Sequence, residues 1–235
     1  MEVIREIKNK NYIYNNQSSL WGESECMGFG KNEFYIKEID RKLANDIIIK
    51  NHYSKKVYNA TYIHLGVFYN DKLKGVLQYG YAMNPASCKS VVKGTEMKEY
   101  LELNRMWIDD DCIKYAESQA ISYSIKYIKR KYPKIKWIQS FADERCGGYG
   151  IVYQSCSFGY YGEHISTFWE FEGEIYHNSI ITDSRRNKKK ELEQRDFKEK
   201  AIKKRLRQFR YIKFIDKREK KNCLLKEQPY PKHYN

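Results

Sequence analysis

The clearest apolar periodicity in the chain predicts a helix that begins near Ala116. Its apolar residues recur at helical spacing and therefore share one face: Ile121, Ile125, Ile128 and Tyr132. Basic residues occupy the last turns, where they complement the helix dipole, and Pro133 ends the helix. Two shorter helices are expected, one at Asp40–Ile49, where a capping aspartate precedes apolar positions, and one at Ile151–Cys156.

Runs rich in β-branched and aromatic residues predict strands on either side of this helix. The runs Tyr62–Phe68 and Leu73–Tyr81 are joined by a Tyr-Asn-Asp-Lys turn, which favours a hairpin. Further strands are expected at Phe34–Ile36, Tyr100–Ile108, Ile135–Phe141, Phe158–Tyr161 and Thr167–Phe171, with loops at 82–98 and 145–148. This order of elements predicts an α/β fold with a mixed central sheet flanked by helices.

The chain divides into three parts by pattern: an N-terminal extension at 1–38, the α/β domain at 39–181 and a basic C-terminal extension at 182–235. At 235 residues the chain is long enough for one well-buried domain and an appendage. The apolar residues of the C-terminal extension are loosely periodic and indicate a helix there: Leu192, Phe197, Ala201, Ile202, Leu206 and Phe209.

The composition is that of a globular protein, with 41% hydrophobic residues, 15% aromatic residues and 22 tyrosines. No apolar run approaches the roughly 20 residues that cross a bilayer. The first residues are charged and lack the apolar core of a secretory signal, so a cytoplasmic protein is expected. The six cysteines include no C-x-x-C pair, which favours free thiols and disfavours a structural zinc site.

The formal charge of +14 is concentrated near the C-terminus. Residues 184–221 contain 18 Lys and Arg against 6 Asp and Glu, a local balance of +12, whereas residues 1–183 carry a balance of about +1. Such a segment attracts a polyanion through phosphate contacts and counterion release, and double-stranded DNA is the expected partner. A solubilising tail remains an alternative reading of the same composition.

The order of elements resembles the acyl-coenzyme A transferase fold of the GNAT type. In that fold a splayed central strand leads into a helix whose first amides and dipole hold the cofactor pyrophosphate. The corresponding residues here are Ala116, Glu117, Ser118 and Gln119, although the usual glycine-rich loop is absent. Tyr153 falls where such enzymes place a tyrosine that protonates the departing thiolate. Packing is the alternative role for Tyr153, and a helix-capping role the alternative for Ser118.

Several ordered motifs sharpen the resemblance: HYSK at 52–55, LNRMW at 103–107, AES at 116–118, WIQSFAD at 137–143, IVYQ at 151–154 and PYPK at 229–232. With this spacing the chain resembles the Mom family of phage DNA-modification proteins. The resemblance implies a GNAT-like enzyme that converts adenine in DNA to N6-methylcarbamoyladenine and so shields phage DNA from restriction. It implies acetyl-coenzyme A and iron as cofactors, and the host cytoplasm as the location of a phage or prophage product.

By position, the resemblance implies functional roles for His52, Tyr53, Arg105, Asp143 and Tyr153, in addition to Ser118. Arg105 can pair with phosphate or carboxylate, or form a structural salt bridge. Asp143 can orient His52, accept a hydrogen bond from the adenine amine, bind metal or cap the following loop. His52, Tyr53 and Asp143 together offer a tentative ligand set for iron.

The adenine amine faces the base pair in duplex DNA, so the base must flip out to react. Tyr58, Trp107 and Trp169 are candidates to stack on the flipped base, with core packing as the alternative for both tryptophans. Two other functions stay open: an N-acetyltransferase that acts on a protein or small-molecule amine, and a non-catalytic DNA-binding protein.

Overall fold

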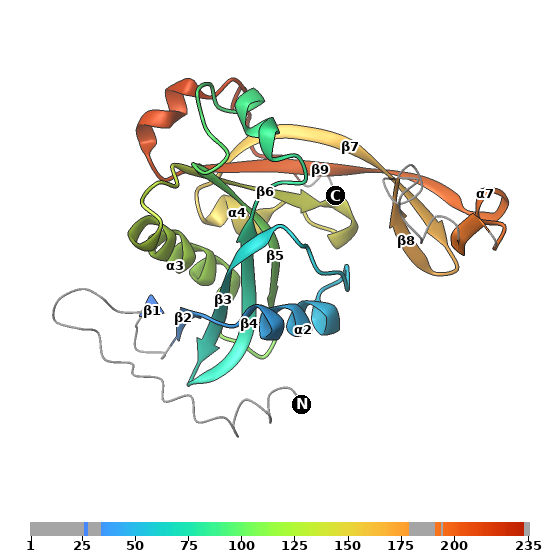
Figure 1. Ribbon diagram of the computed structural model, residues 1–235, viewed down its shortest axis with the longest axis horizontal. Helices are drawn as coiled ribbons and strands as arrows, with labels where there is room; N and C mark the ends of the chain where they lie inside the picture. Colours follow the sequence, from blue (N-terminus) through green and yellow to red (C-terminus); the bar gives the residue numbers. More distant parts are fainter. Residues whose placement is uncertain (1–25, 28–33, 179–190, 194, 233–235) are drawn as a thin grey trace.

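A single mixed sheet organises the computed structural model, which describes residues 26–27, 34–178, 191–193 and 195–232 (Figure 1). Within those residues the strand order is β1-β2-β3-β4-β5-β6-β9-β7-β8. The strands are β1 (Cys26–Met27), β2 (Phe34–Glu38), β3 (Thr61–Tyr69), β4 (Lys72–Gly80), β5 (Tyr100–Ile108), β6 (Trp137–Asp143), β7 (Gly159–Phe171), β8 (Glu174–His177) and β9 (Ile202–Phe214). Neighbouring strands are antiparallel except β5 and β6, which are parallel.

The three helices that the sequence predicts in the α/β domain are confirmed, as is the predicted hairpin turn. The helices are α2 (Arg41–Asn51), α3 (Ala116–Lys131), α4 (Ile151–Ser155) and α7 (Phe197–Lys200), with short 3-10 helices η1 (Pro85–Ser90), η2 (Glu144–Cys146) and η3 (Lys217–Asn222). Asp40 caps α2 by accepting a hydrogen bond from the Lys42 backbone N–H at 2.7 Å. The β3–β4 hairpin turns at Asn70 and Asp71, both at positive φ, as the Asn-Asp pair indicates.

The two faces of the sheet carry separate hydrophobic clusters. Ile121 and Ile128 of α3 and Tyr153 of α4 pack with Leu103 and Ile138 of the sheet. On the other face, Ala44, Ile47 and Ile48 of α2 pack against Tyr35, Phe68 and Val76. The α/β sheet flanked by helices is therefore confirmed, with an α3 face and an α2 face. No helix in the described part of the chain is both long and apolar enough to cross a membrane.

The helix expected between Leu192 and Phe209 is wrong for most of its length. Among the described residues of that stretch, 191–193 and α7 are helical, and residues 202–214 instead form β9, which is hydrogen-bonded to β6 on one side and β7 on the other. Phe209 and Tyr211 are 0% exposed because they alternate onto the α3 face, where they join the core. Non-local pairing overrides the weak helical periodicity. Residues 184–190 of the basic segment lie outside the described residues.

The predicted strands 158–161 and 167–171 belong to one long strand, β7. It pairs with β9 from Gly159 to Glu170, with a bulge between Tyr160 and Glu163. Together β7 and β9 extend past the end of β6 as a two-stranded arm, which carries β8 and α7 at its far end (Figure 1). The arm places basic residues of β9 well away from the centre of the sheet.

Candidate functional site

The parallel strands β5 and β6 separate after a short pairing and leave a wedge. The two strands are paired only from Tyr100, opposite Trp137, to Glu102, opposite Gln139. Beyond these residues the strands diverge from each other. A bulge in β5 adds to the opening, because Tyr79 pairs with Leu103 whereas Gln78 pairs with Arg105, which leaves Asn104 as the extra residue. Such a wedge is the splayed centre that the resemblance to acyltransferases led us to expect.

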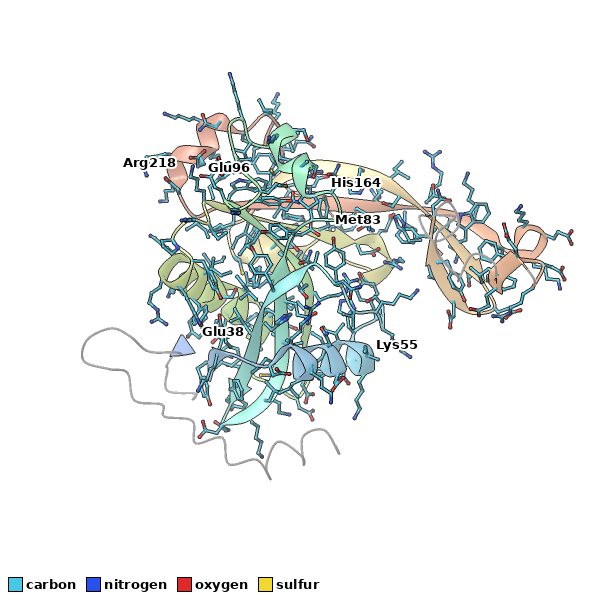
Figure 2. The ribbon with its side chains drawn as sticks, viewed as in Figure 1. Glu38, Lys55, Met83, Glu96, His164 and Arg218 are labelled. Atoms are coloured by element: carbon cyan, nitrogen blue, oxygen red, sulfur yellow. The ribbon has the colours of Figure 1, made fainter. Side chains whose placement is uncertain are left out.

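The bulge also decides where Arg105 lies. Leu103 and Met106 both pack on the α3 face, three residues apart, whereas Trp107 packs against α2. Arg105 alternates with Met106 and therefore lies on the α2 face, near the loop that follows α2 and carries Lys55 (Figure 2). Its Nε donates to the Lys56 carbonyl at 3.2 Å.

Tyr53, Asp143 and Arg145 meet on the α2 face, although the first two are 90 residues apart in sequence. The Tyr53 hydroxyl donates to Asp143 Oδ2 at 3.2 Å, and Arg145 Nε donates to the same oxygen at 2.8 Å. The Arg145 backbone N–H donates to Asp143 Oδ1 at 3.0 Å, and its guanidinium lies 5.3 Å from the Tyr53 ring centre. Asp143 therefore caps the loop, as one alternative held, and also binds a tyrosine and an arginine.

Burial and the two arginines determine the ionisation of this cluster. Burial lowers the pKa of His52 to about 4, and the charges of Arg105 and Arg145 act in the same direction, so the imidazole is neutral at pH 7. Although Tyr53 is 53% exposed, desolvation of its hydroxyl raises its pKa, and the Asp143 carboxylate raises it further. Burial alone would raise the pKa of Asp143, but the hydrogen bonds from Arg145 outweigh it and lower that pKa.

The hydrogen bonds of this cluster do not fit the iron site that the resemblance implies. His52 Nδ1 accepts the Ser54 backbone N–H at 3.1 Å, which places the imidazole proton on Nε2. The Tyr53 hydroxyl donates its proton to Asp143, and Arg145 holds the Asp143 carboxylate, so a metal ion bound by these side chains would have to displace these hydrogen bonds. Among the described residues, no three His, Cys, Asp or Glu side chains gather as a metal site.

Arg105 lacks the structural salt bridge that was its alternative role. No described carboxylate lies within ion-pair distance of its guanidinium, which instead contacts the carbonyls of Lys56 and Asn104 and lies 5.6 Å from the Tyr58 ring centre. Burial lowers the pKa of Arg105 without removing its charge. A partly buried arginine without an ion-pair partner among the described residues is suited to an anionic or carbonyl-bearing ligand.

The start of α3 contains the four predicted cofactor residues on the opposite face. The Ser118 hydroxyl donates to the Tyr115 carbonyl at 3.0 Å, so its proton is engaged within the first turn. Among the described residues no acceptor contacts the backbone N–H of Glu117 or of Ser118, whereas that of Ala116 donates to Ile113 and that of Gln119 donates to Tyr115. The Glu117 side chain is exposed. Two amides at a helix start are the donors that a pyrophosphate needs.

Tyr153 lies on the α3 face beside the wedge. Its hydroxyl is 2.9 Å from Ser140 Oγ, and Ser140 Oγ donates to the Leu103 carbonyl at 3.1 Å. Because Ser140 has a single hydroxyl proton, Tyr153 donates to Ser140 when Ser140 donates to Leu103. Burial raises the pKa of Tyr153 to about 12, so the phenol keeps its proton at neutral pH. Directly after α4, Cys156 Sγ lies 3.3 Å from the Ser118 carbonyl, which connects the helix of Tyr153 to the start of α3.

The candidate residues therefore form two groups separated by the sheet. Ser118 and Tyr153 belong to the α3 face, whereas His52, Tyr53 and Asp143 belong to the α2 face with Arg105. The wedge between β5 and β6 is the point where a ligand on one face can reach a ligand on the other.

Two functional candidates were not predicted from the sequence. Arg145 was assigned to a flexible loop, and only its place two residues after Asp143 hinted at a contact. Glu102 is the one acidic residue of β5 and lies between two leucines, which was the available signal. Its carboxylate accepts hydrogen bonds from Asn104 Nδ2 at 3.0 Å and Gln139 Nε2 at 2.9 Å, at the last pair before the wedge opens.

Two of the three aromatic residues that were candidates to stack on a flipped base have packing roles instead. Trp107 packs against α2, and Trp169 packs 6.0 Å from Phe197 at the end of the arm while its indole N–H donates to Asn178. Both tryptophans therefore have the packing role that was their alternative. Tyr58 lies against Arg105 and is only partly buried, so it is the remaining candidate near the wedge.

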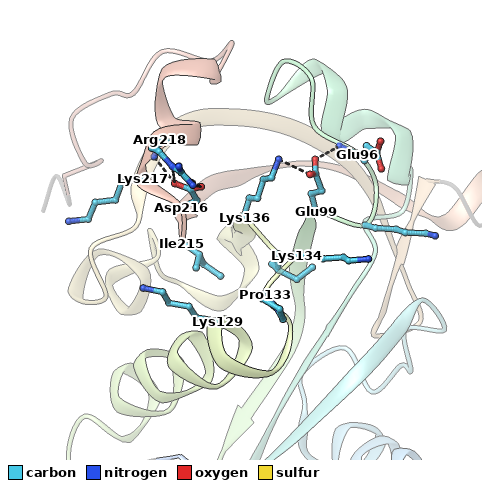
Figure 3. Close-up of a pocket in the computed structure, with 12 residues that line it drawn as sticks. Glu96, Glu99, Lys129, Pro133, Lys134, Lys136, Ile215, Asp216, Lys217 and Arg218 are labelled. Carbon is cyan, nitrogen blue, oxygen red and sulfur yellow. Dashed lines mark hydrogen bonds and ion pairs between the residues drawn. The ribbon is translucent and has the colours of Figure 1, made fainter.

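A surface depression lies at the other end of β5 and β6 (Figure 3). It encloses about 910 Å³ between the end of α3 and η3. Two of its acidic side chains are paired with basic ones: Glu99 lies 2.6 Å from Lys136, and Asp216 lies 2.8 Å from Arg218. Nothing in this depression connects it to the wedge, and we assign it no part in the site.

Sequence comparison shows a close relative. The sequence profile of the Mom protein family matches residues 33–232. The methylcarbamoylase mom of Escherichia phage Mu is 46% identical over 213 residues, which covers 89% of this chain and 88% of the phage protein. The match includes both faces of the sheet, the wedge and the arm.

Structure comparison returns acetyltransferases at low sequence identity. The ribosomal-protein-S5-alanine acetyltransferase from Vibrio fischeri is 10% identical, with a TM-score of 0.49, and the similarity covers 83% of this chain and 98% of that chain. An N-acetyltransferase from Staphylococcus aureus Mu50 is 14% identical, with a TM-score of 0.46, over 77% of this chain and 98% of that chain.

Proposed function

This chain belongs to the Mom protein family, and we propose that it is a transferase that converts adenine in DNA to N6-methylcarbamoyladenine. The observation that carries the proposal is the pair of half-sites on opposite faces of one wedge. A donor on the α3 face and a base on the α2 face can meet there without either crossing the sheet. Protection of phage DNA from restriction, in the host cytoplasm, is the role we propose for the product.

We propose acetyl-coenzyme A as the ligand of the α3 face. The amides of Glu117 and Ser118 would hold its pyrophosphate, and the wedge would admit its pantetheine arm. When bound, the thioester supplies an activated carbonyl carbon. Tyr153, protonated and beside the wedge, would turn its proton from Ser140 to a departing thiolate.

The donor chemistry has a further requirement. A methylcarbamoyl group contains a nitrogen that an acetyl group lacks, so an acetyl donor alone does not complete it. A nitrogen source or a rearrangement must act in addition, and none of the residues at the wedge supplies that nitrogen.

The α2 face would receive the flipped adenine. Arg105 has no carboxylate partner there, and Tyr58 lies beside it with part of its ring exposed, which suits stacking on a base. His52 is neutral and its Nε2 carries the proton, so it can donate a hydrogen bond to a ring nitrogen or carbonyl. Tyr53, Asp143 and Arg145 would form the wall of this pocket.

The arm of β7 and β9 is the part of the basic extension that we propose contacts DNA. Arg205 is exposed and forms no ion pair with a described residue, and Lys203 lies 5.8 Å from the Trp169 ring centre. Lys204 and Arg207 are instead paired with Glu170 and Glu144. A two-stranded ribbon with basic side chains fits a DNA groove, and phosphate contacts fix its position on the duplex.

The direct test is the composition of DNA from bacteria that produce the full chain. DNA digested to nucleosides should contain deoxyadenosine with the added mass of a methylcarbamoyl group, measured by mass spectrometry. Unmodified deoxyadenosine in cells that contain ample folded protein would overturn the proposal. Acetylation of protein or small-molecule amines in the same cells would instead favour an ordinary N-acetyltransferase.

A further inference from the structure

A largely buried polar cluster, to which the proposed function assigns no role, lies at the vertex of the wedge. Glu102 and Gln139 form the last pair of β5 and β6, and Asn104 is the bulged residue of β5. The two amide groups donate to the two oxygens of the Glu102 carboxylate. The Asn104 amide also donates to the Tyr81 carbonyl at 3.2 Å, which fixes its orientation.

Two amide oxygens in this cluster lack hydrogen-bond donors. Among the described residues, nothing donates to Asn104 Oδ1 or to Gln139 Oε1, although both atoms are buried and Gln139 is only 3% exposed. Turning either amide around does not help, because its oxygen would then face the Glu102 carboxylate. A buried acceptor without a donor is costly, so the cluster is built for a group that brings N–H or O–H donors.

The surrounding charges select the kind of donor. Burial raises the pKa of Glu102 to about 7, while the hydrogen bonds from Gln139 and Asn104 and the charges of Arg210 and Arg105 oppose that shift. Burial also raises the pKa of Tyr58, which lies near Glu102, to about 12, so Tyr58 keeps its proton. Two nearby arginines disfavour an alkylammonium, whereas a neutral amine on an aromatic ring brings two N–H donors and no charge.

We propose that Glu102, Asn104 and Gln139 form the pocket that recognises the exocyclic amine of the flipped adenine. The inference rests on the proposed function, which supplies adenine as the base. One N–H of the amine donates to the Glu102 carboxylate, and the other to an amide oxygen of Asn104 or Gln139. The amine nitrogen is thereby held at the wedge vertex, where a donor from the α3 face arrives.

The test compares binding of two DNA duplexes by the full-length protein. Each carries one base opposite an abasic site, so that flipping costs little, within randomised flanks. The base is adenine in one duplex and purine, which lacks the exocyclic amine, in the other. We expect the wild-type protein to bind the adenine duplex about ten- to hundredfold more tightly, because a hydrogen bond to a charged group is lost with purine.

The variants are Glu102→Gln and Gln139→Leu, with Glu38→Gln as the matched control. Glu38 is also a partly buried carboxylate with two hydrogen-bonded partners, Lys131 and Tyr132, but it lies on β2 beside the end of α3 (Figure 2). We expect both wedge variants to lose most of the preference for adenine and Glu38→Gln to retain it. Thermal unfolding of each variant verifies that it is folded.

The outcomes separate the two proposals. Equal binding of adenine and purine by the wild-type protein, or full preference in folded Glu102→Gln and Gln139→Leu, would overturn the recognition pocket. If the wild-type protein prefers adenine through these residues but leaves DNA unmodified in cells, the pocket stands and the proposed reaction fails. If DNA is modified but the preference does not depend on Glu102 or Gln139, the reaction stands and the pocket fails.

Discussion

Asp143 and Glu144 are adjacent in sequence, and an arginine binds each carboxylate. Substituting each in turn tests how burial changes the contribution of such a pair to stability. Each accepts hydrogen bonds from the backbone N–H, Nε and Nη2 of one arginine, Arg145 for Asp143 and Arg207 for Glu144. Their side chains differ in exposure, at 6% for Asp143 and 31% for Glu144. The pair therefore offers Asp143→Asn as the perturbation and Glu144→Gln as its control.

In Asp143→Asn a neutral amide replaces the carboxylate that accepts from Nε and Nη2 of Arg145. Arg145, which is partly buried, therefore loses its counter-ion. Breaking a buried pair costs about 3–5 kcal/mol, and because Arg145 remains partly exposed we expect about 3 kcal/mol. The pair of Glu144 and Arg207 is more exposed, so Glu144→Gln should cost about 1 kcal/mol or less. A loss of this size lowers the midpoint of thermal unfolding by about 6–12 °C for Asp143→Asn, at roughly 2–4 °C per kcal/mol.

Urea unfolding at pH 7 measures the free energies of unfolding directly. The pKa of Asp143 is lowered in the folded state, so its contribution is present above the unfolded pKa and is lost as pH falls through the folded pKa. The difference between wild type and Asp143→Asn should therefore shrink below about pH 4. Equal losses for the two variants, or a difference that persists at low pH, would refute the argument from burial.

Three further predictions concern the other residues of the account. Tyr153→Phe should reduce formation of modified deoxyadenosine about a hundredfold or more. The control Tyr79→Phe also removes a buried tyrosine hydroxyl bonded to a serine, and it should change that formation by no more than a few-fold. Comparable losses in the two variants would contradict the acid role of Tyr153. Because burial lowers the folded pKa of His52 to about 4 from its ordinary value of 6.5, the protein should lose stability as pH falls from about 6.5 to 4; His52→Asn should weaken that dependence, and an unchanged pH profile would contradict a buried neutral imidazole. Lys203→Gln with Arg205→Gln should weaken DNA binding and lower the slope of log K against log salt by about 0.9 per lost phosphate contact; an unchanged slope would exclude the arm from the DNA interface.

Local pattern was sufficient to predict most of the individual elements. The α3 helix, the β3–β4 hairpin and the capped α2 are each determined by nearby residues, such as Asp40 at a helix start or Asn70 in a turn. The strand β9 could not be predicted in this way, because its basic residues resemble a solvated helix. Only pairing with β6 and β7, more than 30 residues earlier in the chain, gives Phe209 and Tyr211 a buried place.

The sequence motifs identified several residues of the candidate site, but they did not predict how these residues are arranged in space. The motifs selected Tyr53, Arg105 and Asp143, and the structure brings Tyr53 and Asp143 into contact. The β5 bulge, which turns Arg105 toward the α2 face, depends on pairing with β4 and leaves no signal in spacing. Glu102 was missed for the same reason, since its importance arises from being the last residue that pairs before the wedge.

The central claim is that an acyl donor on the α3 face and adenine on the α2 face meet in one wedge. Its most direct test supplies duplex DNA and acetyl-coenzyme A, labelled with carbon-13 in the acetyl group, to extract from cells that produce the full chain. The account predicts that modified deoxyadenosine carries the label, and that extract with Tyr153→Phe yields little of it. Modified deoxyadenosine without the label would contradict the claim that the acyl group enters through this wedge.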